Sequence, residues 1–244
     1  MPEDEWQYET APDLDRTLIE RLRRFPREPD ILMYGLRSIA ASVVASWLRL
    51  YHRLEVQGRE HLPIDGSFVL CSNHQSHLDA LSVLAALPFR RLHRTFVAAA
   101  EDYFFTSAVR TFVSAVAVNA LPFSRRVSSR HSIEVCRELI SRAGNVLVIF
   151  PEGTRSTDGR MGQFKPGIGR LLAATAVPAL PCYLAGAFEA LPKGRIVPRP
   201  AKLSLFIGPG RRYDTVAPDA GGARSVAGDL EQAVRELEAL HGSP

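Results

Sequence analysis

The chain has 244 residues, of which 46% are hydrophobic and 23% are charged, a composition typical of a globular domain with a sizeable core. Its net charge is +4, and the first 20 residues hold seven acids and one Arg, so the remainder is more basic than the total suggests. This charge favours an anionic partner such as phospholipid headgroups or a phosphorylated substrate. It does not favour nucleic acid, because basic and aromatic residues are not interleaved.

Residues 1–30 form an acidic, proline-containing arm with a short helix expected at 14–24. Residues 31–54 are predicted to form an amphipathic helix. One interpretation places this helix on a membrane surface, and the other packs it on the domain core. Its longest uncharged run, 38–48, has 11 residues, and a span needs about 18–20. The apolar stripe comprises Leu32, Leu36, Ile39, Val43, Trp47, Leu50 and Leu54.

Residues 55–244 are expected to form one domain in which strands and helices alternate. Such alternation predicts an α/β sheet covered by helices on both faces. Three scattered cysteines without a C-x-x-C pair indicate reduced core thiols in the cytosol. The segment 119–126 is expected to end a strand, and 159–169 is a polar, glycine-rich connection. Strands are predicted at 54–56, 67–70, 94–98, 115–118, 145–150, 177–184 and 203–207, and helices at 78–87, 103–113, 128–142 and 224–240.

A polar segment, 72–79, follows the second predicted strand and precedes a helix. If His74 lies in the loop and Asp79 in the first helical turn, the carboxylate can accept the Nδ1 proton of the imidazole. Nε2 is then free to take a proton from a hydroxyl group. The spacing Ser76-x-x-Asp79 also resembles a capping box. Asp79 can therefore orient His74, close a helix, or do both.

A second polar segment, 150–156, follows the predicted strand at 145–150. Pro151 and Gly153 favour a tight turn in which backbone N–H groups approach a ligand closely. Thr154 and Arg155 add a hydroxyl and a guanidinium, a donor set that can hold a phosphate, and Lys165 is expected to be a further phosphate contact. The alternative is an ordinary surface turn.

No metal site is predicted. The spacing His74-x-x-His77-x-Asp79 does not match the common zinc patterns, and no later His or Glu pair completes a set. His77 is interpreted as a residue of a pocket wall or of the surface. A nucleophilic role for Ser72 is disfavoured because the G-x-S-x-G elbow is absent.

The order of four segments resembles the glycerolipid acyltransferase family, and in particular the 1-acylglycerol-3-phosphate type. These segments are Asn73-His74-x4-Asp79, Pro122-Phe123-Ser124-Arg125, 150–156 (F-P-E-G-T-R-S) and 177–181 (V-P-A-L-P). The resemblance covers residues 54–210. It implies a mixed α/β sheet flanked by helices, with an N-terminal helical element that lies on the membrane, and residues 31–54 match that element.

The resemblance also implies residue roles. His74 is expected to be the general base and Asp79 its orienting partner. Backbone N–H groups near His74 are expected to stabilise the oxyanion. The substrate-binding residues are expected to be Asn73, Arg125, Glu152, Gly153, Thr154, Arg155 and Lys165, and most of them belong to the acceptor-phosphate site.

The function implied by this resemblance is transfer of a fatty acyl group from a thioester to the free hydroxyl of a lysophospholipid such as 1-acylglycerol-3-phosphate. Acyl-CoA or acyl carrier protein serves as co-substrate, and no other cofactor is expected. The protein is expected to sit peripherally on the cytoplasmic face of a membrane. Two alternatives remain open: a different lyso-lipid or glycolipid acceptor, and a non-catalytic lipid-binding protein with the same fold.

Overall fold

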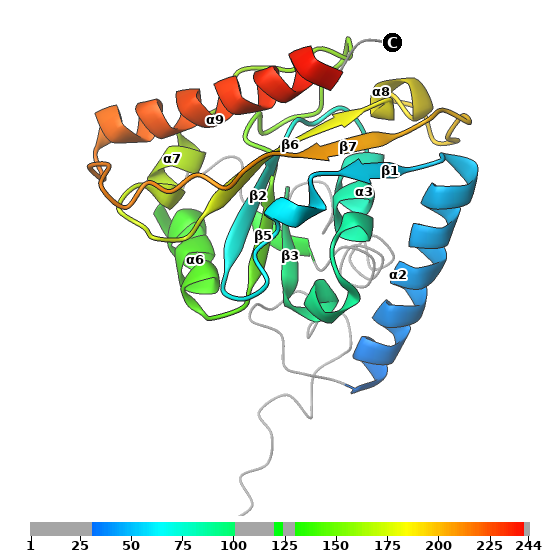
Figure 1. Ribbon diagram of the computed structural model, residues 1–244, viewed down its shortest axis with the longest axis horizontal. Helices are drawn as coiled ribbons and strands as arrows, with labels where there is room; N and C mark the ends of the chain where they lie inside the picture. The colour runs from blue at the N-terminus through cyan, green and yellow to red at the C-terminus, as the bar shows by residue number, and fades with distance from the viewer. Residues whose placement is uncertain (1–30, 101–119, 124–129, 242–244) are drawn as a thin grey trace, which may run out of the picture.

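The computed structural model describes residues 31–100, 120–123 and 130–241. These residues form a seven-stranded sheet in the order β1-β7-β6-β2-β5-β3-β4 (Figure 1). All neighbouring strands are parallel except β6 and β7, which confirms the expected mixed α/β sheet. The strands are β1 (Glu55–Gln57), β2 (Phe68–Ser72), β3 (Thr95–Ala100), β4 (Ala120–Phe123), β5 (Val146–Ile149), β6 (Ala179–Ala185) and β7 (Ser204–Ile207).

Helices cover both faces of this sheet, with α6 and α7 to its left and α2 and α3 to its right in Figure 1. The α-helices are α2 (Ile31–Tyr51), α3 (Leu78–Ala86), α6 (Arg130–Ser141), α7 (Gly167–Leu172), α8 (Ala187–Ala190) and α9 (Ala220–His241). Two short 3₁₀ helices, η1 (Arg59–His61) and η2 (Phe89–Arg94), complete the described elements. The helices predicted at 14–24 and 103–113 and the strand predicted at 115–118 lie outside the described residues.

Strand β2 shows how the core is divided between the two faces. Phe68 and Leu70 point into a cluster with residues of α2 and α3. Val69 and Cys71 point into a second cluster with residues of α6, α7 and α9. All five residues of β2 are buried, because a central strand of a doubly covered sheet is apolar on both sides.

Two segments differ from the sequence-based expectation. Residues 120–123 form β4, a strand at the edge of the sheet that pairs with β3. Pro122 is tolerated there because an edge strand has one side on which no ladder N–H is required. Residues 167–172 form α7 rather than a connection, although this helix contains two glycines. A Cβ at Gly169 would overlap the Ala223 carbonyl oxygen of α9, so the glycine permits close contact between the two helices.

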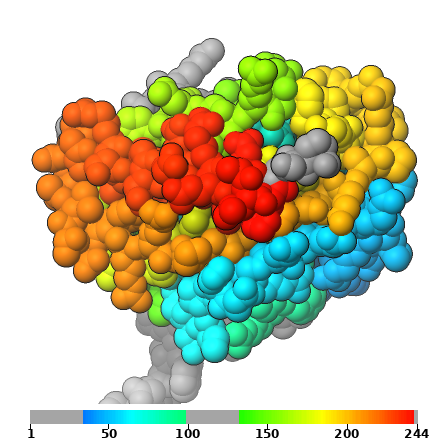
Figure 2. Space-filling view, turned by 45° about the horizontal axis from the view of Figure 1, so that its top comes forward, coloured from blue at the N-terminus to red at the C-terminus, as the bar shows by residue number. Residues whose placement is uncertain are grey.

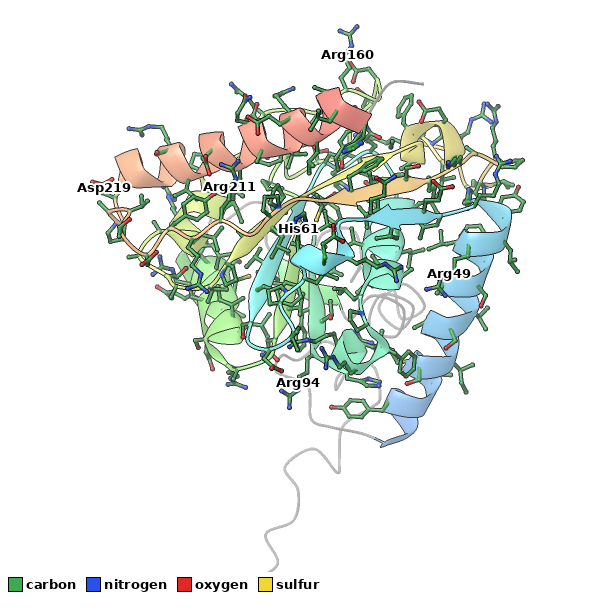
Figure 3. The ribbon with its side chains drawn as sticks, viewed as in Figure 1. Arg49, His61, Arg94, Arg160, Arg211 and Asp219 are labelled. Atoms are coloured by element: carbon green, nitrogen blue, oxygen red, sulfur yellow. The ribbon has the colours of Figure 1, made fainter. Side chains whose placement is uncertain are left out.

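Helix α2 ends at Tyr51, three residues before the predicted end at 54. It packs on the core through Leu48 and Trp47, as one of the two interpretations expects, but most of the predicted stripe is not on the buried face. The buried face carries Leu48 and Arg37, and Arg37 donates to the Thr95 carbonyl oxygen at 3.1 Å. Arg49, labelled in Figure 3, donates across to the Ala85 carbonyl of α3. The predicted stripe instead faces outward at four described positions, namely Leu36, Ile39, Val43 and Leu50. No helix in residues 31–100 or 130–241 has an apolar stretch sufficient to span a bilayer.

Candidate active site

The two polar segments meet because β2 and β5 are neighbours in the sheet. Cys71 of β2 pairs with Ile149 of β5 in parallel register, so both strands end at the same edge. His74 follows the end of β2 by two residues, and Glu152 follows the end of β5 by three. This is the carboxyl edge of parallel strands, where open α/β sheets bind ligands.

The His74 side chain is held by Asp79. Its Nδ1 lies 2.8 Å from Asp79 Oδ2, and the side chains are 19% and 1% exposed, respectively. The imidazole also stacks on the Phe150 ring, with centroids 4.2 Å apart and planes 18° apart. A carboxylate that accepts the Nδ1 proton leaves Nε2 unprotonated, and an imidazole in this state can remove a proton from a hydroxyl.

Asp79 also closes the start of α3, so both interpretations of this residue hold in one geometry. Asp79 Oδ2 accepts the backbone N–H groups of Gln75 at 2.6 Å and Ser76 at 2.8 Å, and Ser76 Oγ accepts from Leu78 N–H at 3.1 Å. Backbone N–H groups near His74 were expected to stabilise the oxyanion, but three of these groups are already bound to carboxylates. The N–H groups of Gln75 and Ser76 are already bound by Asp79, and that of His74 is bound by Glu152.

Glu152 joins the two segments. Its side chain is buried, and its Oε1 accepts from His74 N–H at 2.6 Å while Oε2 accepts from Gly162 N–H at 2.8 Å. Ser156 N–H donates to the His74 carbonyl oxygen at 2.8 Å. The main chain of His74 is therefore held on both sides by the second segment. Burial raises the pKa of Glu152 above its usual value, and the two N–H contacts partly oppose this.

These contacts revise the expectation that Glu152 lines the acceptor-phosphate site. Both oxygens of its carboxylate are bound to backbone N–H groups, and a carboxylate repels a phosphate. The carboxylate instead contacts the His74 main chain, and we interpret Glu152 as a positioning group for His74. Asn73 is revised in the same way: its side chain is 1% exposed, and its carboxamide bonds to both the N–H and the carbonyl oxygen of Leu184 in β6. A substrate contact by Asn73 would require breaking these bonds.

The donor-rich part of the second segment surrounds Gly153. This residue has φ +69°, and a Cβ at this position would lie 2.7 Å from Lys165 Nζ. Lys165 N–H also donates to the Pro151 carbonyl oxygen at 3.0 Å. Thr154 is exposed and Arg155 is half-buried beside them. The structure thus brings together the predicted donors Gly153, Thr154, Arg155 and Lys165, whereas Arg125 lies outside the described residues.

His77 is half-buried next to this group of cations. Burial, followed by the charges of Arg155 and His74, lowers the pKa of His77 to about 4. The ring is therefore neutral near pH 7, and it forms part of the wall rather than adding a positive charge.

Two residues of the first segment were not singled out from the sequence as site residues. Gln75 is buried, and its Nε2 donates to the Gly159 carbonyl oxygen at 2.6 Å. Ser76 Oγ donates to the Leu191 carbonyl oxygen at 2.8 Å. Their polarity in a buried strand-to-helix turn was the available signal, because buried polar groups need partners. In the described part of the chain, no group of three or more His, Cys, Asp or Glu residues is arranged to hold a metal ion.

Comparison with protein families gives a match between residues 53–185 and the model of the acyltransferase family. The chloroplast 1-acyl-sn-glycerol-3-phosphate acyltransferase BAT2 of Brassica napus is 33% identical over 153 residues, which are 59% of this chain and 40% of the relative. The human 1-acyl-sn-glycerol-3-phosphate acyltransferase alpha is 33% identical over 135 residues, 54% of this chain and 45% of the relative. The matched part therefore spans less than half the length of each relative.

Among solved structures, the 1-acyl-sn-glycerophosphate acyltransferase PlsC of Thermotoga maritima is similar to this chain. The superposition has a TM-score of 0.62 and 24% sequence identity, and it covers 84% of this chain and 80% of the other. At this identity the match establishes a shared fold.

Proposed function

The chain belongs to the acyltransferase family, and from that premise we propose that it transfers a fatty acyl group from an acyl thioester to the free hydroxyl of a lysophospholipid, with 1-acylglycerol-3-phosphate as acceptor. The observation that carries this proposal is the hydrogen bond between His74 Nδ1 and Asp79 Oδ2 at the carboxyl edge of the sheet, beside the group of donors around Gly153. The names of the relatives support the choice of acceptor.

In the proposed reaction, His74 Nε2 removes the proton from the acceptor hydroxyl as the oxygen attacks the thioester carbonyl. Asp79 stabilises the imidazolium that forms and keeps the ring in the productive tautomer. The tetrahedral intermediate then expels the thiolate, and the imidazolium supplies its proton. Asp79 and Phe150 hold the ring in place through the hydrogen bond to Nδ1 and the stacking contact.

The acceptor phosphate is proposed to bind at Gly153, Thr154, Arg155 and Lys165. The positive φ of Gly153 and its missing Cβ leave room for the Lys165 ammonium group beside the turn. A phosphate held there fixes the distance between the acceptor hydroxyl and His74, and such positioning can supply a large part of the rate enhancement. Neutral His77 limits the number of cations near the imidazolium.

A lysophospholipid acceptor is a lipid found in membranes, and helix α2 is proposed to bind the protein to the membrane surface. Its exposed stripe includes Ile39, Val43 and Leu50, which are 66%, 63% and 81% exposed. A helix with such a face lies in the interface plane with its apolar side among the acyl chains. The proposed location is peripheral, on the cytoplasmic face, and no cofactor besides the acyl thioester is proposed.

Thiol release tests the proposal directly. Purified protein is incubated with an acyl thioester and lysophosphatidic acid, and the free thiol is measured together with the phosphatidic acid formed. Acyl-CoA and acyl carrier protein are compared as donors, and other lyso-lipids are compared as acceptors. Turnover with another lyso-lipid, and none with lysophosphatidic acid, would change the substrate assignment. Absence of turnover with every pair, in protein that still binds lipid, would favour the non-catalytic lipid-binding alternative.

A further inference from the structure

The segment Pro192–Pro200, which we name loop 192–200, exposes two large aliphatic side chains at its tip. Ile196 is 92% exposed and Val197 is 75% exposed. Ile196 is more exposed than the outward residues Leu36, Ile39, Val43 and Leu50 of the α2 stripe. Full exposure of adjacent aliphatic residues is unfavourable in water, and exposed apolar patches often mark an interaction surface.

Loop 192–200 is also strongly basic. It carries Lys193, Arg195 and Arg199, with Lys202 just beyond it, and no acidic residue occurs between 190 and 213. Lys202 pairs with Glu55 at 2.8 Å. Aliphatic side chains flanked by cations are complementary to an anionic bilayer, since the acyl chains accept the former and the headgroups accept the latter.

Loop 192–200 is fixed to the end of helix α2. Tyr51 OH donates to the Pro198 carbonyl oxygen at 3.3 Å, and His52 Nδ1 lies 3.1 Å from the Ala201 carbonyl oxygen. Arg199 N–H donates to the carbonyl oxygen of Ala190, the last residue of α8, at 2.8 Å. Figure 2 shows the two regions adjoining at the right, with the loop region in yellow and α2 in blue. Loop 192–200 therefore lies beside the end of α2, where the exposed stripe reaches Leu50.

Loop 192–200 starts next to the candidate active site. The residue before it, Leu191, accepts the Ser76 Oγ hydrogen bond at 2.8 Å, and Ser76 lies two residues after His74. A bilayer bound by the loop would thus be adjacent to the turn that carries the imidazole.

We propose that loop 192–200 is a second lipid-binding element, which inserts Ile196 and Val197 into an anionic bilayer and places Lys193, Arg195 and Arg199 at the headgroups. This goes beyond the proposed function, which assigns membrane contact to α2 alone. An acidic protein such as an acyl carrier protein would also match the cations. The attachment of the loop to the end of α2, whose apolar stripe is exposed, favours lipid, because an acidic protein would not need that stripe.

Insertion is tested with a fluorophore at the tip. All three native cysteines, Cys71, Cys136 and Cys182, are buried, so a thiol introduced by Ile196→Cys can be labelled selectively with nitrobenzoxadiazole. The matched control is Ile64→Cys, which is 71% exposed and precedes β2 at the opposite edge of the sheet. Vesicles of phosphatidylcholine with phosphatidylglycerol should blue-shift and brighten the probe at 196 and leave the probe at 64 unchanged. Equal responses at both sites, or none at 196, would overturn the proposal. A response at 196 to acyl carrier protein but not to vesicles would also overturn it.

Sedimentation with the same vesicles measures how much the cations of loop 192–200 contribute to membrane binding. Lys193→Gln and Arg195→Gln should each weaken binding about fivefold, since each surface cation contributes about 1 kcal/mol. The matched control is Arg224→Gln in α9, a helix that begins next to the labelled Asp219, away from α2 in Figure 3. This variant should leave binding unchanged. Equal effects of the loop and control variants would contradict the proposal. Neither measurement involves turnover, so an inactive protein whose loop inserts would refute the proposed function alone.

Discussion

The substitution Glu152→Gln separates two roles for this carboxylate, positioning of His74 and binding of the acceptor phosphate. The carboxylate accepts one N–H from His74 and one from Gly162. A carboxamide of the same shape has one accepting oxygen, so its NH₂ group must face one of the two N–H donors. The variant therefore loses at least one hydrogen bond to a charged acceptor and leaves a buried donor unpaired.

A hydrogen bond to a charged group contributes about 1.5–3 kcal/mol. Part of that loss is offset, because burial raises the pKa of Glu152 and the variant no longer buries this charge. We expect a net destabilisation of about 1–2 kcal/mol, which for a domain of this size lowers Tm by roughly 2–8 °C. A displacement of the His74 main chain by about 1 Å should lower kcat by about 10–100-fold.

The assay is steady-state thiol release with the acceptor varied, alongside a thermal unfolding measurement. Glu152→Gln should lower kcat and leave the acceptor KM within about twofold, because a positioning residue acts on the chemical step. The comparison variant is Lys165→Gln, which should raise the acceptor KM because it removes a cation from the proposed phosphate site. An unchanged kcat with a raised acceptor KM in Glu152→Gln would refute the positioning role and restore the phosphate assignment.

Three further outcomes are expected. His74→Ala should lower kcat by roughly 10²–10⁴-fold, the usual contribution of a general base, and near-normal turnover would exclude this role. The pKa of folded His77, about 4, lies below the unfolded value of 6.5, so the unfolded chain binds more protons and the free energy of unfolding falls as pH drops from 6.5 to 4. Urea unfolding should show that the free energy of unfolding falls less between pH 7 and pH 4.5 in His77→Gln than in the unsubstituted protein. The difference should be at most about 3 kcal/mol, and less with solvent screening. An equal fall in both proteins would contradict the lowered pKa of His77. Gly169→Ala should destabilise the protein by about 1–3 kcal/mol because its Cβ would overlap Ala223. The control Gly228→Ala in α9, whose Cβ would meet nothing within 4 Å, should be neutral or stabilising by up to about 1 kcal/mol. Similar unfolding midpoints of the two variants would show that α7 and α9 can separate at little cost.

The sequence predicted the local elements well where apolar periodicity was strong. The buried strand near 68–72, the helix from 78 and the amphipathic helix near the C-terminus all form. Periodicity failed for α7, whose two glycines disfavour a helix by propensity. Contact with α9 offsets that cost, and this contact is not visible in a local window of sequence.

Periodicity also could not predict that the apolar stripe of α2 faces outward. An apolar stripe identifies a face of a helix but does not specify what covers it. Packing against α3 uses the neighbouring face with Leu48, which leaves Ile39 and Val43 exposed.

The sequence by itself determined which chemical groups are present: an imidazole five residues before a carboxylate, and a glycine-centred turn followed by cations. Only the tertiary structure decided how they are used. The parallel pairing of β2 with β5 brings residues 74 and 152 together, so that the Glu152 carboxylate accepts the His74 N–H. The physical reason is that contacts between residues 78 positions apart depend on strand order and register, which local sequence does not encode.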